Sequence, residues 1–516
     1  MKPVRWTILF AGALLAAAQT DPVVSVTGGQ IRGRLTSGGG AAFKAIPYAR
    51  PPVGDLRWRD PQPVTPWQGV READQFARAC TQISEGWNAR YVTGSGEDCL
   101  YLNVSTAEWP PQPKHPVMLW IHGGSNTAGS GEAAGFDQRT MVHHGLVLVT
   151  INYRLGALGF MAHPELDRES PHHTSGDYGL MDQLAALHWV RDNIAKFGGD
   201  SANVTVAGQS AGSYDISLLL TSPLAKGLFQ RAIAESGATS GFKGSLTAAR
   251  AQEAGRALAA QLNAPETGAI EFLRAKSPEE ILTAANATRR VTGIGRDGLE
   301  TSIDGYVLPK SPTEVFAAGG SMRVPLIVGS QAQETGGPNN PAQLRETIRK
   351  AYGGLADAAL KLYGLAGDGT GQADALYGGI GAQWSTDTGF RCPATAEALG
   401  HAAGAQPTYR YEFEHAPPGR QATSHSSELN FLFATWPANT QLSDMDRLIS
   451  QQAQDYWANF ARSGDPNGKG LPAWPKFTAK GQEYLAFTDS GAASKAVLRR
   501  AFCEVFMESL KLPPAK

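Results

Sequence analysis

A serine between two glycines is the clearest candidate for nucleophilic chemistry in this chain. Residues 208–212 read Gly-Gln-Ser-Ala-Gly and match the pattern G-x-S-x-G, with Ser210 at its centre. An apolar run at 203–207 precedes the pattern and another at 216–220 follows it, which predicts a strand, a sharp turn and a helix. The helix N-terminus under such a turn favours developing negative charge. Ser210 is therefore the predicted nucleophile of an acyl-transfer reaction.

A serine hydroxyl needs a general base, and in a strand–turn–helix arrangement the base lies later in the chain. Three histidines are found there, His401, His415 and His425. His401 lies in a stretch rich in alanine and glycine, and His415 directly follows an expected strand. His425 lies in a polar loop, from which a side chain can reach over the edge of a sheet. The pattern favours His425 and leaves His415 as the alternative.

The base in turn needs a carboxylate to orient it. Glu334 is the acidic residue of the loop 330–334, which follows the apolar run 324–328. Asp304 is the alternative, although an Asp-Gly pair such as 304–305 is more often simply a turn. Glu334 is the predicted acid.

Backbone donors for an oxyanion are expected after an early strand. His122-Gly123-Gly124-Ser125 follows the apolar run 117–121. The N–H groups of Gly124 and Ser125, with that of Ala211, are predicted to point at one oxygen. Losing one such donor typically raises the barrier by about 2.7–4 kcal/mol.

The elements that must position these residues alternate along the chain. Short apolar runs bounded by glycine or polar residues predict strands at 117–121, 146–151, 203–207, 324–328 and 409–413. Helical patterns cover 181–197 and 445–462. Strands that alternate with helices indicate an α/β fold with a mostly parallel sheet covered on both faces. No repeat or long linker divides the chain, so one insertion-rich domain is expected.

The first 18 residues predict export. Lys2 and Arg5 precede a short apolar run that ends in the small residues Ala16 and Ala18. This run is too short to span a bilayer as a helix, which takes roughly 20 residues, and it is typical of a secretory signal peptide. The mature chain is then 19–516, exported to the periplasm or the outside.

The charge and the cysteines agree with an exported protein that binds small molecules. The 516 residues carry 46 Lys+Arg against 47 Asp+Glu, which argues against nucleic acid as the main partner. Four cysteines suit an oxidising compartment and allow three pairings. The simplest is Cys80 with Cys99, which are close in sequence, and Cys392 with Cys503. No cysteine or histidine cluster has the spacing of a metal site.

Together these residues resemble the type-B carboxylesterases, the cholinesterase-like branch of the α/β-hydrolases. The resemblance covers nearly the whole mature chain. Its further motifs are residues 43–49 with 51–54, 97–104, 152–156, 197–200 and 425–429. It implies an α/β-hydrolase fold with a twisted sheet and large insertions, in a single domain at 19–516. It also implies Ser210, Glu334 and His425 as nucleophile, acid and base, the two disulfides given above, and a carboxylic ester as substrate, with no metal or organic cofactor.

Two departures from the family pattern concern the substrate. The third glycine of the oxyanion loop is replaced by Ser125 and the following aromatic residue by Asn126, and Gln209 stands where the family often has Glu. Asn126 and Gln209 are therefore candidate substrate contacts, and we expect a more polar acyl site.

Three other functions share parts of this pattern. A lipase should have a long apolar lid, and the segment between Cys80 and Cys99 is mostly polar. A peptidase uses the same triad, and the sequence does not separate it from an esterase. A non-catalytic adhesion module of the cholinesterase-like type typically lacks the nucleophile, which is present here as Ser210. A small-molecule esterase without a membrane span is the favoured function, and the sequence does not indicate an oligomeric state.

Overall fold

The computed structural model describes residues 21–132, 141–241, 244–293 and 299–511. The predicted signal peptide at 1–18 lies outside the described residues.

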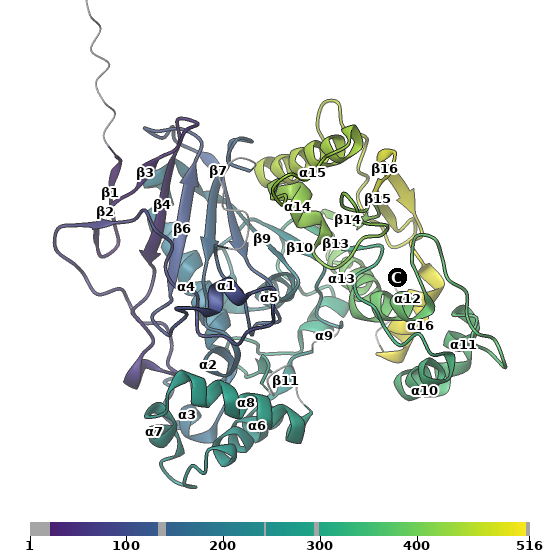
Figure 1. Ribbon diagram of the computed structural model, residues 1–516, viewed down its shortest axis with the longest axis horizontal. Helices are drawn as coiled ribbons and strands as arrows, with labels where there is room; N and C mark the ends of the chain where they lie inside the picture. The colour runs from purple at the N-terminus through teal and green to yellow at the C-terminus, as the bar shows by residue number, and fades with distance from the viewer. Residues whose placement is uncertain (1–20, 133–140, 242–243, 294–298, 512–516) are drawn as a thin grey trace, which may run out of the picture.

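One large sheet crosses the molecule (Figure 1). In the described chain it has eleven strands, in the spatial order β16 (Gly491–Ala496), β15 (Glu483–Thr488), β14 (Thr408–Phe413), β13 (Leu326–Gln331), β10 (Arg231–Glu235), β9 (Gly199–Gln209), β7 (His115–Ile121), β8 (Val147–Ile151), β6 (Tyr101–Thr106), β4 (Ala41–Pro47) and β3 (Arg34–Leu35). The strands from β15 to β8 in this order are parallel to their neighbours, and the outer pairs are antiparallel. The predicted mostly parallel sheet is confirmed.

The central strands are apolar on both faces because helices cover both. In β7, Val117 and Leu119 face a core shared with α4 (Tyr178–Asn193) and α5 (Ala211–Leu219). The alternate residues Met118 and Trp120 face a second core, shared with α15 (Asp444–Ser463). Side chains of a strand point to opposite faces in turn, so a strand buried between two helical layers reads as one continuous apolar run.

The remaining helices are mostly short and lie around these layers. They are α1 (Ala89–Val92), α2 (Gly156–Phe160), α3 (Pro164–Glu169), α6 (Ala248–Gln261), α7 (Ala269–Arg274), α8 (Pro278–Thr292), α9 (Pro312–Ala317), α10 (Pro341–Tyr352), α11 (Ala356–Leu362), α12 (Ile380–Thr386), α13 (Cys392–Ala403), α14 (Ser427–Phe433) and α16 (Arg500–Ser509). Two small sheets, β1 (Val23–Val26) with β2 (Gly29–Arg32) and β5 (Val70–Glu72), and β11 (Leu246–Thr247) with β12 (Ser302–Ile303), complete the described elements. Helices α6, α7 and α8 form one group beside the sheet, and α10 and α11 lie far from them (Figure 1).

The predicted strands and helices are found with small shifts of their ends. The strand predicted at 203–207 is longer, since β9 begins at Gly199. The helix predicted at 181–197 is α4 followed by a 3₁₀ turn at Ile194–Phe197, which ends at Gly198 with φ +82°. A glycine tolerates this left-handed conformation, which explains why the helix stops there.

The parallel strands bring four loops to one edge of the sheet. Strands β7, β9, β13 and β14 all run in the same direction, and their carboxyl ends meet at the same edge. The loops that follow these four strands carry, respectively, the His-Gly-Gly segment, Ser210, Glu334 and His425. Ligand sites of open α/β sheets lie outside the carboxyl ends of the strands, so this edge is the place for a site.

Both predicted disulfides are present. Cys80 is bonded to Cys99, closing a loop that contains α1, and Cys392 is bonded to Cys503, joining α13 to α16. None of the described helices is long and apolar enough for a membrane span.

A buried carboxyl group joins α13 to the helix that follows Ser210. Glu397 in α13 accepts hydrogen bonds from the Ser217 hydroxyl of α5, at 2.7 Å, and from the Thr239 N–H, at 3.4 Å. Burial raises the pKa of Glu397 to about 7, and the two hydrogen bonds oppose that rise. Because burial disfavours the charged form, this carboxyl keeps its proton in slightly acidic solution.

Removing the long-range disulfide is expected to cost more stability than removing the short one. Cys392 and Cys503 are 111 residues apart, and Cys80 and Cys99 are 19 apart. Loop closure over these lengths contributes about 5 and about 3 kcal/mol in the chain-entropy account. We expect Cys392→Ala/Cys503→Ala to unfold at a lower urea concentration than Cys80→Ala/Cys99→Ala. Equal unfolding midpoints would contradict this order.

Glu397 is expected to make stability depend on pH. Its pKa is about 7 in the folded protein against 4.5 as the reference value, so the native state binds the extra proton between these pH values. The free energy of unfolding therefore falls as pH rises through this range, by up to about 1.4 kcal/mol per pH unit, and is then constant. Glu397→Gln should remove this slope in urea unfolding, and the exposed control Glu346→Gln should keep it. An unchanged slope in Glu397→Gln would refute the assignment.

Candidate active site

Ser210 occupies a strained turn between β9 and α5. Its φ is +59° and its ψ is −119°, a backbone conformation that residues other than glycine rarely adopt. The Ser210 N–H donates to the carbonyl of Glu235 at the end of β10, at 2.8 Å, and the Ser210 carbonyl accepts from the Tyr214 N–H in α5. Neighbouring elements on both sides therefore hold the turn in place.

Two glycines of the motif let this turn press against the end of β7. A Cβ atom on Gly212 would lie 2.1 Å from the carbonyl oxygen of Ile121, and one on Gly208 would lie 2.6 Å from the same oxygen. Both distances are too short for any other residue, so the glycines are required by packing. This close approach also places the His-Gly-Gly segment, which begins directly after Ile121, beside the nucleophile.

The structure brings Ser210, His425 and Glu334 together. The Ser210 Oγ lies 2.8 Å from the Nε2 of His425, and the His425 Nδ1 lies 2.7 Å from the Oε2 of Glu334. The Glu334 side chain is fully buried, and that of His425 is 27% exposed. The geometry is that of a nucleophile, a base and an orienting acid in hydrogen-bond contact.

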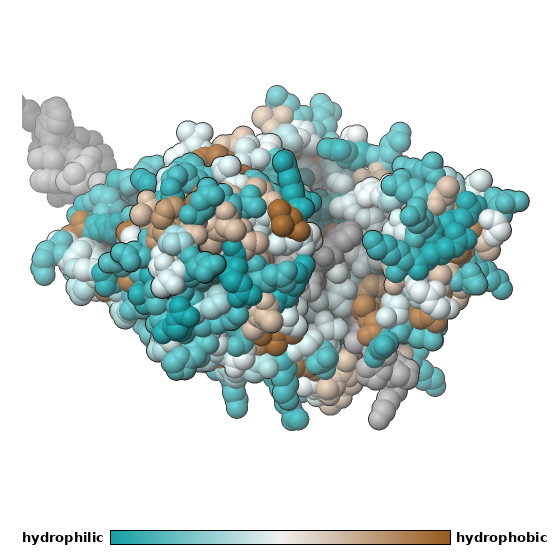
Figure 2. Space-filling view, turned by 90° about the horizontal axis from the view of Figure 1, so that it is seen from below, coloured by the Kyte–Doolittle hydropathy of each residue, from teal (hydrophilic) through white to brown (hydrophobic). Residues whose placement is uncertain are grey.

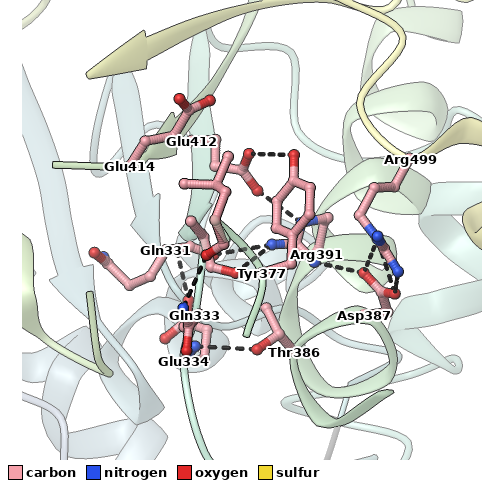
Figure 3. Close-up of polar contacts among 12 residues, drawn as sticks. Gln331, Gln333, Glu334, Tyr377, Thr386, Asp387, Arg391, Glu412, Glu414 and Arg499 are labelled. Carbon is pink, nitrogen blue, oxygen red and sulfur yellow. Dashed lines mark hydrogen bonds and ion pairs between the residues drawn. The ribbon is translucent and has the colours of Figure 1, made fainter. Parts of the chain in front are cut away.

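Three further hydrogen bonds hold Glu334. Its second carboxylate oxygen accepts from the Gln331 N–H at 2.8 Å, and its own N–H donates to the Thr386 hydroxyl at 3.0 Å (Figure 3). The Glu334 carbonyl accepts from the His425 N–H at 2.7 Å. Glu334 is thus bonded to His425 through both its backbone and its side chain.

The alternative residues lie in other surroundings. His415 is held between Asp446, at 3.0 Å, and Asp489, at 2.6 Å. His401 is buried in α13, where it bonds to the Ser321 hydroxyl. Asp304 accepts hydrogen bonds from three of the backbone N–H groups that follow it, as a turn residue does.

The oxyanion segment is a turn with three successive left-handed residues. Gly124, Ser125 and Asn126 have φ values of +113°, +61° and +58°. The Gly124 carbonyl accepts from two later N–H groups of the same turn, at 3.0 Å each. Gly124, Ser125 and Ala211 all line the cavity that also contains Ser210 and His425. The three residues predicted to supply the donors therefore line the same cavity as Ser210.

The two candidate substrate contacts differ in where they lie. Gln209 lines the cavity, and its Nε2 is 3.4 Å from the Nε2 of His425. Asn126 is buried: its amide donates to Asp215 at 2.8 Å and its oxygen accepts from the Tyr153 hydroxyl at 2.9 Å. The Asn126 side chain thus ties the oxyanion segment to the core, and it is not among the described residues that line the catalytic cavity.

The cavity in front of Ser210 has a volume of about 1230 Å³. Its walls are mixed. The aromatic and larger aliphatic residues are Trp87, Tyr91, Trp120, Tyr214, Leu246, Phe390 and Leu429, and the charged and polar ones include Arg90 of α1, Arg289 of α8, Glu300, Thr335 and Ser236. Trp87 is 55% exposed. Seen from below, the surface is largely hydrophilic and is hollowed between the part with α6–α8 and the part with α10 and α11 (Figure 2). Both α8, through Arg289, and Phe390 line the cavity.

Two more buried carboxyl groups lie close to the triad. Glu235 in β10 accepts from the indole N–H of Trp457 at 2.7 Å, and burial raises its pKa. The pKa of Glu428 is also raised, first by burial and then by the charges of Glu235 and Glu334. Both groups are therefore biased towards the neutral form, which limits the negative charge near Glu334.

The contacts that several residues make at the site could not be predicted from the sequence. Thr386 holds Glu334, Asp215 holds Asn126, and the ring of Phe390 lies 5.0 Å from that of His425. Each is far along the chain from its partner and belongs to no motif.

Comparison with known proteins agrees with this geometry. The profile of the carboxylesterase family matches residues 20–506. Liver carboxylesterase 1F of Rattus norvegicus is 34% identical over 90% of this chain and 90% of its own length. Fumonisin B1 esterase of Sphingopyxis macrogoltabida is also 34% identical, over 93% of this chain and 89% of its own length.

A solved structure gives the same result for the fold. A PNB esterase superimposes with a TM-score of 0.81 at 30% identity, and the match covers 94% of this chain and 99% of that one. The predicted α/β-hydrolase fold is thereby confirmed. The chain belongs to the carboxylesterase family and is a carboxylic ester hydrolase of the serine hydrolase type.

Proposed function

We propose that the protein is a secreted serine carboxylesterase that cleaves small-molecule esters through an acyl-enzyme intermediate. The observation that carries the proposal is the chain of contacts from the Ser210 Oγ through the His425 imidazole to Glu334, at 2.8 and 2.7 Å. A serine alcohol becomes an effective nucleophile when a base at this distance accepts its proton.

The reaction has two halves. His425 takes the proton of the Ser210 hydroxyl through Nε2 as the oxygen attacks the ester carbonyl, and Glu334 stabilises the imidazolium at Nδ1. The imidazolium then protonates the leaving alcohol, and the acyl group remains on Ser210. In the second half His425 activates a water molecule, which hydrolyses the acyl-enzyme and releases the acid.

The oxyanion of each tetrahedral intermediate is assigned to the N–H groups of Gly124, Ser125 and Ala211. The left-handed turn at 124–126 and the packing of Gly212 against Ile121 support this assignment, since they preorganise the donors before substrate arrives. Gln209, beside His425, is the one candidate substrate contact that faces the cavity.

The cavity is large enough for a bulky organic ester. Ligand sites typically measure about 300–1,000 Å³ and are largely apolar, and this one is somewhat larger at about 1230 Å³. The loop that carries Trp87, between Cys80 and Cys99, contains only the short helix α1, which argues against a long apolar lid and so against a lipase.

Export is proposed on two grounds. The basic and apolar residues of 1–18 have the character of a signal peptide, and two disulfides suit an oxidising compartment. The mature protein is then 19–516, a single catalytic domain.

Ser210→Ala is expected to abolish ester hydrolysis. Loss of a nucleophilic serine typically lowers kcat about 10⁶-fold, so hydrolysis of p-nitrophenyl acetate should fall to near background. Ser222→Ala is a matched control, because the Ser222 hydroxyl is also buried but donates to the Val307 carbonyl, away from the site. Full activity of Ser210→Ala would refute the proposed mechanism. A series of longer acyl chains and a matching anilide then separate an esterase from a lipase and a peptidase.

Asn126→Ala is expected to slow hydrolysis without changing the acyl preference. The variant removes the two hydrogen bonds that tie residue 126 to the Tyr153 hydroxyl and to Asp215 and so loosens the oxyanion turn, and kcat should therefore fall roughly tenfold or more on every ester. Acetyl, butyryl and succinyl p-nitrophenyl esters make the comparison. Asn103→Ala is the control, since Asn103 is buried and bonded to Thr150 elsewhere. A change in the ratio between esters would instead show that Asn126 contacts the acyl group.

A further inference from the structure

The loop that carries Glu334 rests on an irregular helical turn. Helix α12 continues into a π-helical turn at Asp387–Arg391, and α13 begins at Cys392. The Cys392 N–H donates to the Asp387 carbonyl, five residues back, where an α-helix would reach back four. Such turns are rare and are frequently found at functional sites.

Thr386, directly before this turn, and Arg391, its last residue, hold the backbone at Glu334 and just before it. Thr386 accepts a hydrogen bond from the Glu334 N–H at 3.0 Å. The guanidinium of Arg391 donates to the Ala332 carbonyl at 2.6 Å and lies 3.5 Å from the Gln331 carbonyl (Figure 3). The segment 331–334 is thus held by the Thr386 hydroxyl as an acceptor and the Arg391 guanidinium as a donor.

The π turn explains how both side chains reach one loop. Thr386 and Arg391 are five residues apart, an offset of about 140° around a regular α-helix, which would put them on different faces. In a π turn the hydrogen bonds join residues five apart, so two residues with this spacing lie nearly above one another on the same face of the helix. The wide turn therefore turns both side chains toward the acid loop.

The charge of Arg391 is balanced inside the protein. Its side chain is fully buried, with Glu412 at 2.7 Å and Asp387 at 2.5 Å. Burial lowers the pKa of Arg391, but these two carboxylates outweigh the effect and raise it, so the group stays charged. Tyr377 lies over the guanidinium, 4.6 Å from ring centre to Cζ, and its hydroxyl lies 3.3 Å from Glu412.

The same turn is bonded to the C-terminal helix. Arg499, next to α16, donates to both carboxylate oxygens of Asp387 at 2.7–3.0 Å (Figure 3). The disulfide between Cys392 and Cys503 joins the two elements covalently. Phe390 of the turn also lies against His425 and lines the cavity, so one turn contacts the acid loop, the base and the cavity wall.

We propose that Thr386 and Arg391 are positioning residues of the ester hydrolysis, held by the π turn so that they keep Glu334 in place against His425. The inference rests on the proposed triad. Neither residue touches the substrate or the reacting atoms. Both act through the backbone of 331–334, and an error of about 1 Å in the position of a catalytic group can cost roughly 100-fold in rate.

Thr386→Val is the sharpest test, because it keeps the shape of the side chain and removes the acceptor of the Glu334 N–H. We expect kcat for p-nitrophenyl acetate to fall about 10- to 100-fold, with KM within about twofold of wild type. Thr386→Ser keeps a hydroxyl and should restore kcat. Arg391→Lys, which keeps the charge but not the fork of donors, should lower kcat in the same way.

A matched control separates positioning from stability. Arg57 is also buried, pairs with Glu97 at 2.6 Å and donates to the carbonyls of Leu273 and Lys276, away from the triad. Arg57→Lys should lower the melting temperature much as Arg391→Lys does, yet keep kcat. All rates are measured well below each variant's melting temperature, with the folded fraction checked by circular dichroism.

The outcomes are distinct. A wild-type kcat in folded Thr386→Val overturns the proposal, and so does an equal loss of kcat in Arg57→Lys and Arg391→Lys. If Arg391→Lys does not fold, the Thr386→Val and Thr386→Ser pair decides. A failure of the proposed function shows separately, as esterase activity that survives Ser210→Ala in the otherwise unchanged protein.

Discussion

The contact of the nucleophile turn with the end of β7 is the constraint on which the site depends. Gly212 approaches the Ile121 carbonyl so closely that a side chain has no room, and the strained φ of Ser210 is held by the Glu235 carbonyl beyond it. Strain at a single residue typically costs about 1–3 kcal/mol and persists only where the surroundings over-determine it. Here the two strands on either side of β9, β7 and β10, supply that support and align the oxyanion segment with Ser210.

The distribution of charge follows from burial. Glu334 is the buried end of the proposed triad. Two further carboxyl groups, those of Glu235 and Glu428, lie nearby in the interior and have raised pKa values. When these two carboxyl groups are neutral, Glu334 is not surrounded by other negative charges. On the other side Arg391 is surrounded by Glu412 and Asp387, so its positive charge is neutralised locally while its donors remain directed at the acid loop.

The features that could be predicted from the residues alone are mainly those formed by residues close together along the chain. The turn around Ser210 and the central strands are local patterns, and the order of nucleophile, acid and base restricted the choice of Glu334 and His425. The residues alone left His415 open, because only the folded chain shows it held between Asp446 and Asp489. Asn126 was expected at the substrate for the same reason: its direction depends on Asp215 and Tyr153, which are remote in sequence. The π turn after α12 was not predicted, and its partners Arg499 and Cys503 lie more than 100 residues further along the chain.

The bonds between α16 and the π turn have a consequence for the time at which the active site can form. Arg499 and Cys503 are synthesised almost 300 residues after Ser210, and only then can Asp387 and Cys392 be secured. Until that moment a nascent chain has its nucleophile but not the full support of its acid. Under the proposed role of the π turn, α16 completes the support of the acid, so full hydrolytic activity follows the docking of this helix.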